Sequence, residues 1–90
     1  MTIRTLLLAD EIGLPTDTGT ATSFTSATVV RLVNTTSTAA VVTVVETQSG
    51  TGIGSMTILG NAVELLEKKP SHCVFASAST VRGTKVGFTN

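Results

Sequence analysis

Blocks of β-branched and other apolar residues, bounded by turn-forming residues, fill the chain from Phe24 onward. Successive side chains of a β-strand point to opposite faces, so blocks of this length and spacing predict several short antiparallel strands. Apart from one ambiguous segment, the predicted strands span residues 25–33, 39–47, 55–59, 73–77 and 82–88.

The two longest predicted strands, residues 25–33 and 39–47, carry apolar side chains on both faces. In the first, Val30 and Leu32 share one face, while two valines and an arginine share the other. A strand of this kind is either central and covered or pressed against another subunit. The residues that we expect at a partner interface on these strands are Val29, Val33, Val41 and Val45.

The connections between the strands consist of residues that favour turns. Residues 34–38 are Asn, Thr and Ser, whose short side chains bond to nearby backbone, so we expect them to fold the chain back as a hairpin. Gly60 and Asn61 predict a tight turn after residues 55–59, in which Met56 and Ile58 share a face.

Residues 61–69 fit either a short helix or a strand. Asn61 as a cap, Glu64 paired with Lys68, and the stop at Pro70 favour a helix. Two helical turns are marginal without packing, and the other predicted elements are strands. We therefore favour a strand, with Val63 and Leu65 on its core face and Glu64 and Leu66 pointing away.

The N-terminal 23 residues differ in composition from residues 24–90. Residues 2–9 form a predicted strand or arm, and a connector rich in Gly, Pro and Thr follows, which we expect to be flexible. We predict that the arm adds a strand to the sheet of a neighbouring subunit. The arm residues expected at that interface are Arg4, Leu6, Leu7 and Leu8.

The composition supports a protein made almost entirely of strands. Among 90 residues, 18 are Thr and 11 are Val, while Trp and Tyr are absent. We predict an all-β fold, a small antiparallel β-sandwich (Ig-like) or barrel of about six to seven strands with an extended N-terminal arm.

The charge balance and the few aromatic residues disfavour several classes of partner. Six basic side chains cancel six acidic ones, so we expect neither nucleic acid nor an anionic membrane as a partner. Three Phe are barely enough for a core, so none is expected to form an exposed stacking surface. This disfavours binding of sugars or single-stranded nucleic acid. No segment approaches the roughly 20 apolar residues of a membrane span.

Residues suited to catalysis or metal binding are scarce. His72 and Cys73 are the single residues of their kinds, and as neighbours in a strand they point to opposite faces. A structural zinc site needs four such ligands. Glu64 and Glu67 would share a face only in a helix. We therefore expect no catalytic residue, no cofactor and no metal, and a protein that is not an enzyme.

Four segments together are similar to small Thr/Val-rich β-sandwich proteins of tailed bacteriophage virions, including those of cyanophages. They are residues 28–45 (TVVRLVNTTSTAAVVTVV), 54–59 (GSMTIL), 67–70 (EKKP) and 74–77 (VFAS). The resemblance implies a capsid decoration or cement protein that binds the outer surface of the major capsid shell and stabilises it. It also implies assembly in the host cytoplasm, a homo-oligomer such as a trimer, and the major capsid protein or another virion protein as partner.

Two other functions fit the same strand pattern. A phage tail, neck or fibre module would also be small, rich in strands and assembled in many copies. An Ig-like cell-surface adhesion or binding domain would share the strands, although such a domain normally carries export information and exposed binding aromatics.

Overall fold

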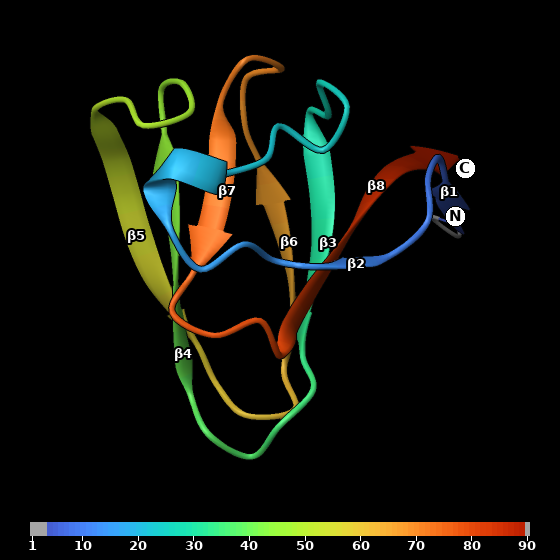
Figure 1. The fold of residues 1–90 in the computed structure, drawn as a ribbon. Helices are drawn as coiled ribbons and strands as arrows, with labels where there is room; N and C mark the ends of the chain where they lie inside the picture. Colours follow the sequence, from blue (N-terminus) through green and yellow to red (C-terminus); the bar gives the residue numbers. More distant parts are fainter. Residues whose placement is uncertain (1–3, 90) are drawn as a thin grey trace.

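The computed structural model describes the backbone of residues 4–89 and the side chains of residues 6–87, which form two facing sheets (Figure 1). The elements of this part of the chain are β1 (Arg4–Leu7), β2 (Ile12–Gly13), the 3-10 helix η1 (Thr18–Thr20), β3 (Val29–Asn34), β4 (Ala40–Val45), β5 (Gly52–Ile58), β6 (Val63–Glu67), β7 (Cys73–Ala76) and β8 (Val81–Thr89).

The two sheets are antiparallel and confirm the predicted all-β sandwich. One sheet has the order β1-β8-β3-β6, with β2 pairing along the same strand β8, and the other has the order β5-β4-β7. β5 and β6 are edge strands of different sheets, and the sheets do not close into a barrel.

The connections follow the order of a jelly roll. Thr22 forms an antiparallel bridge with Val74, which places the segment before β3 at the outer edge of β7. From β3 onward, each connection crosses between the sheets except the one from β4 to β5. Two sheets linked in this way form the paired Greek keys of a jelly roll. An Ig domain instead keeps its last two strands in one sheet, whereas β7 and β8 lie in different sheets.

The main core lies between the sheets and is built from alternate residues of the central strands. Val30 and Leu32 of β3, which were predicted to share a face, are fully buried, and Val42 of β4 faces them from the other sheet. Ile58 and Val74 complete the centre of the core. Each such side chain contributes about 1.5–3 kcal/mol through removal from water.

Residues 35–39 do not close a hairpin, which corrects the prediction for this connection. β3 pairs with β6 and β8, whereas β4 pairs with β5 and β7, so the segment crosses from one sheet to the other. The buried Asn34 side chain stabilises the crossing. Its Nδ2 donates to Thr38 O at 2.8 Å and to Ile58 O at 3.3 Å, and its Oδ1 accepts from Thr36 N at 3.2 Å.

Residues 63–67 form strand β6, which confirms a strand rather than a helix in this segment. The assignment of its faces was wrong. Leu66 is half-buried against the main core, whereas Val63 and Leu65 are 48% and 55% exposed on the outer face. The segment 23–28 explains this orientation, because it binds the Lys68 side chain, two residues beyond Leu66, on the inner side of the sheet.

Residues 12–23, interpreted from the sequence as a flexible connector outside the body, pack on both sheets. Leu14 is 1% exposed in the main core, and its N–H donates to Val81 O at 2.8 Å. Pro15 O accepts a hydrogen bond from Ala76 N at 2.9 Å. Ala21 covers the outer face of the smaller sheet, where η1 lies in front of β7 (Figure 1). The segment therefore contributes to the packing of residues 24–90.

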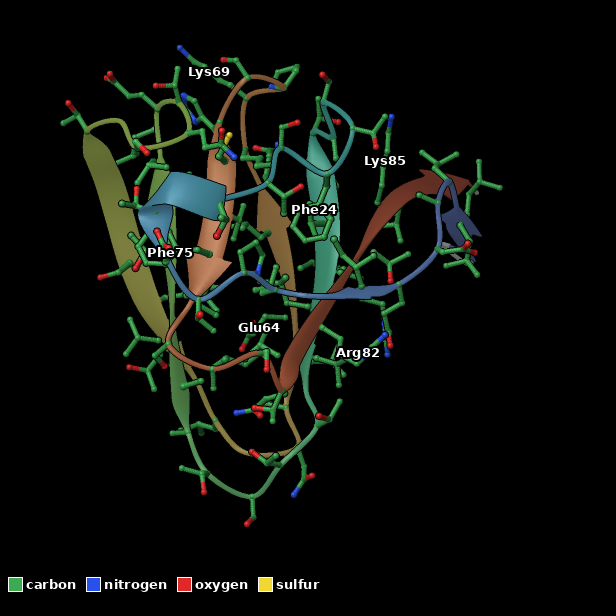
Figure 2. The ribbon with its side chains drawn as sticks, viewed as in Figure 1. Phe24, Glu64, Lys69, Phe75, Arg82 and Lys85 are labelled. Atoms are coloured by element: carbon green, nitrogen blue, oxygen red, sulfur yellow. The ribbon has the colours of Figure 1, made fainter. Side chains whose placement is uncertain are left out.

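A left-handed turn immediately precedes β3. Phe24, Thr25 and Ser26 have φ values of 54°, 56° and 57°, which is uncommon for residues with a Cβ atom. The N–H of Ala27 donates to Ser23 O at 3.1 Å across the turn. This backbone directs the Phe24 ring toward the core (Figure 2), where it lies against Gly83.

Candidate functional site

The N-terminal strand pairs within its own chain, which corrects the predicted strand addition to a neighbour. β1 runs antiparallel to the end of β8, from Arg4 opposite Thr89 to Leu7 opposite Val86. The nine-residue strand β8 offers this edge in the same chain, so no second subunit is needed to pair it. The side chain of Arg4 and residues 2 and 3 lie outside the described part of the structure.

The leucines predicted at the partner interface of the arm remain exposed despite this pairing. Leu6, Leu7 and Leu8 are 48%, 69% and 49% exposed. Figure 1 shows β1 and the end of β8 projecting together away from the sandwich body. The backbone of the arm is thus partnered, while its apolar side chains remain accessible to another molecule.

The outer face of the larger sheet brings predicted interface residues together with others that the sequence analysis missed. Val33 lies opposite Val63, and Arg31 lies opposite Leu65, in neighbouring strands. Val29 and Val33 are half-buried, whereas Val63 and Leu65 are largely exposed. We call this surface, formed by Val29, Arg31, Val33, Val63 and Leu65, the β3–β6 face.

A polar border lies beside the β3–β6 face. Glu11 accepts a hydrogen bond from Arg82 Nε at 2.8 Å, and its other carboxylate oxygen lies 3.9 Å from Arg31 Nη1. The Arg82 side chain lies at the outside of the larger sheet (Figure 2). An apolar centre with a charged rim is the usual anatomy of a protein interface.

The two predicted interface valines of β4 have different surroundings. Val41 is 43% exposed, in agreement with an outward position. Val45 is 3% exposed, because it packs with Ala21, Cys73 and Phe75 on the outer face of the smaller sheet. The sequence did not show that the N-terminal segment covers this end of β4, so Val45 is corrected to a core residue.

Strand β5 is an open edge without charges. Among the described strands it pairs only with β4, and no charged residue occurs from Thr47 to Val63. Charges, Pro and bulges are the devices that normally prevent edge strands from pairing with other chains. Here a single register shift, between Val44 and Val45, interrupts the ladder beside β5.

A groove of about 750 Å³ lies along the seam between the two sheets, where the edges of β5 and β6 diverge. Its apolar walls come from β4, β5 and β6, and the loop after β6 forms its polar end. The lining residues are Thr28, Val42, Val44, Ile53, Gly54, Ser55, Met56, Leu66, Glu67, Lys68, Lys69, Pro70 and His72. This volume lies within the range of small-molecule sites.

Lys68 is a buried cation at the polar end of the groove. Its Nζ donates to the backbone oxygens of Ser23 at 2.9 Å, Ala27 at 2.7 Å and Lys69 at 3.3 Å. None of the ion pairs between described side chains includes it. Burial lowers the pKa of Lys68; nearby Cys73 opposes this shift, and the charge of Lys85 adds to it.

Lys68 was not predicted from the sequence as a buried residue, although the strand pattern contained a signal. Glu64, Leu66 and Lys68 are spaced by two residues, so a strand with Leu66 facing inward also directs Lys68 inward. Because Val63 and Leu65 were assigned to the core face instead of Leu66, Lys68 was expected to point outward. A pair of lysines before a proline otherwise resembles a solvated loop.

The two candidate residues His72 and Cys73 have different surroundings in the structure. Cys73 is buried, and its Sγ donates weakly to Ser71 O at 3.7 Å, while His72 lines the groove. No group of three or more His, Cys, Asp and Glu side chains in the described part could hold a metal ion. No helix of the described chain has the length and apolar character to cross a membrane.

Comparisons with known proteins add no relatives: no family model, curated protein or solved structure matches the chain.

Proposed function

We propose that this chain is a non-enzymatic structural protein of a phage virion, a capsid decoration or cement subunit that binds the outer surface of the major capsid shell. The observation that carries the proposal is the exposed β3–β6 face, whose most exposed apolar side chains are Val63 and Leu65. Such a face is suited to burial against another protein.

The chemistry of this face suits a flat and permanent contact. Valine side chains are stiff and lose little conformational freedom when they are buried. Arg31, within the face and opposite Leu65, and Glu11 beside it provide charged groups that can determine the orientation of a partner. The partners in this proposal are the major capsid protein and further copies of this chain, as in a trimer.

The fold supports the proposal by analogy. Jelly rolls occur in viral capsid proteins, and also in lectins and cupins, so the strand order alone does not define a function. The scarcity of aromatic side chains disfavours the sugar-stacking surfaces of lectins.

Fractionation of purified phage particles tests the proposal. The particles are separated into capsids and tails, and the chain is quantified in each fraction by mass spectrometry. We expect it with the capsids at a constant ratio to the major capsid protein. Enrichment with tails would support a tail, neck or fibre module instead, and absence from both fractions would refute a virion role.

A further inference from the structure

A glycine of β5, Gly54, forms part of the wall of the groove between β5 and β6. Gly54 lies on β5 directly opposite Val44 and lines the groove. No glycine among the described residues has a positive φ, so Gly54 is not required by its backbone conformation. An added Cβ at Gly54 would meet nothing within 4 Å. A glycine inside a strand marks a bulge, as at the register shift beside Gly54, or the close approach of a ligand or another backbone.

The walls of the groove are aliphatic. Val44, Met56 and Leu66 are each half-buried against the main core, with the rest of their surface directed to the groove. Met side chains adapt their shape to an irregular apolar occupant. The described lining contains no Phe, Tyr or Trp side chain, and its one aromatic ring is the imidazole of His72 in the loop after β6, so a flexible aliphatic chain fits these walls better than a flat ring system.

The polar end of the groove carries an excess of positive charge. Lys68 and Lys69 line it together with a single carboxylate, that of Glu67. The three donors of the Lys68 ammonium are occupied by backbone oxygens, so its charge lacks an anionic partner rather than hydrogen bonds. Lys69 is exposed at the end of the molecule formed by the β6–β7 loop (Figure 2). A buried cation without a counter-charge favours an anionic group nearby.

We propose that this groove binds a single unbranched aliphatic chain with an anionic head group, the chain lying over Gly54 and Met56 and the head group beside Lys69. The shared chemistry is that of a fatty acid or of one acyl chain of an anionic lipid. This site is separate from the β3–β6 face, so it does not depend on the proposed virion role.

Calorimetric titration of the full chain with dodecanoate, below its micellar concentration, tests the proposal. We expect saturable 1:1 binding that weakens by about fourfold for each methylene removed from the ligand. Dodecylammonium, with the same chain and the opposite charge, should bind at least about tenfold more weakly, because the cationic end of the groove repels it. Equal affinity for the two ligands, or no saturable binding of dodecanoate, would overturn the proposal.

Two pairs of variants locate the site. Gly54→Val should fill the groove and weaken dodecanoate binding by at least about tenfold, whereas Gly52→Val, at an equally open glycine outside the lining, should leave the affinity unchanged. Lys69→Gln should weaken binding, whereas Thr57→Glu, with the same change in net charge on an exposed residue of β5, should not. Full affinity in Gly54→Val would place the ligand elsewhere.

Two further measurements distinguish other occupants. Vesicles of an anionic phospholipid test whether the aliphatic chain in the groove comes from a lipid surface. Binding of dodecanoate without binding to the vesicles would assign a free fatty acid as the ligand. Sedimentation velocity of the native chain and Gly54→Val tests the other natural occupant, a strand from a second copy. If the native chain does not bind dodecanoate and Gly54→Val loses self-association, the occupant of the groove is a strand from a second copy and the ligand proposal is wrong.

Discussion

The Lys68 ammonium joins parts of the chain that are more than 40 residues apart in the sequence. Its hydrogen bonds connect the end of β6 to the left-handed turn before β3, and the backbone N–H of Lys68 donates to Thr28 O at 2.9 Å. The turn has three consecutive positive φ values, so its conformation depends on such contacts. Lys85 supports the same turn through Thr25 O at 3.0 Å.

Replacing Lys68 should therefore destabilise the protein. In Lys68→Met the backbone oxygens of Ser23 and Ala27 lose their donor, and we expect a decrease of about 1–3 kcal/mol in the free energy of unfolding. Urea denaturation measures this change. Lys69→Met, at the exposed neighbouring lysine, is the control and should change stability by no more than about 0.5 kcal/mol. Equal effects of the two substitutions would contradict a structural role for Lys68.

Gly83 is needed where β8 passes the Phe24 ring. An added Cβ would lie 2.6 Å from Phe24 Cζ and 3.1 Å from Leu32 Cδ2, so Gly83→Ala should destabilise the fold by about 1–3 kcal/mol. Gly52→Ala meets no neighbouring atom and should leave stability unchanged or raise it by up to about 1 kcal/mol. Thermal unfolding of both variants provides the comparison, and a neutral Gly83→Ala would contradict the observed packing of the ring.

At the scale of elements, the segment between β2 and β3 acts as part of the sandwich. Leu14 enters the main core, and Thr22 pairs with Val74 at the edge of β7, where the backbone hydrogen bonds are 3.1 and 2.8 Å. The edge of β7 is therefore covered, whereas no described strand pairs with the outer edges of β5 and β6.

Leu14→Ala tests the contribution of this segment. Truncation of a fully buried leucine should decrease the free energy of unfolding by about 2–5 kcal/mol. Thr16→Ala, at an exposed position two residues later, should have little effect. Chemical denaturation of both variants distinguishes a packed segment from a loose one. If the segment were loose, Leu14→Ala would have the same free energy of unfolding as the native chain.

The elements that sequence predicted well are those determined by local alternation. The shared face of Val30 and Leu32 was predicted in this way, whereas the strand at residues 63–67 was favoured because a helix of two turns is marginal and the other predicted elements are strands. The pairing of strands was less predictable, because the turn residues after Asn34 suit a hairpin and a crossing equally well. Lys68 and the groove depend on contacts between distant segments, for which local spacing has only a weak signal.

At the scale of the whole molecule, the exposed apolar surface lies in separate places that can serve different partners. The β3–β6 face lies on the outside of the larger sheet, the leucines of the N-terminal arm lie beside the end of β8, and the groove opens along the seam between the sheets. A chain of 90 residues with net charge zero has little electrostatic repulsion to oppose association of these surfaces.

Leu65→Lys should weaken self-association without unfolding the chain. The side chain is 55% exposed, so we expect stability within about 0.5 kcal/mol of the native value, while the new charge opposes burial of the β3–β6 face. Sedimentation velocity over a range of concentrations measures the effect. Thr57→Lys, exposed on β5 of the other sheet, adds the same charge and should associate like the native chain.

Co-sedimentation of the purified chain with isolated capsids tests the proposed function most directly. We predict saturable binding of the native chain and of Thr57→Lys, and loss of binding in Leu65→Lys. A native chain that remains in the supernatant at every concentration, or a Leu65→Lys variant that binds capsids as tightly as the native chain, would contradict the assignment of the β3–β6 face as the surface that binds the shell.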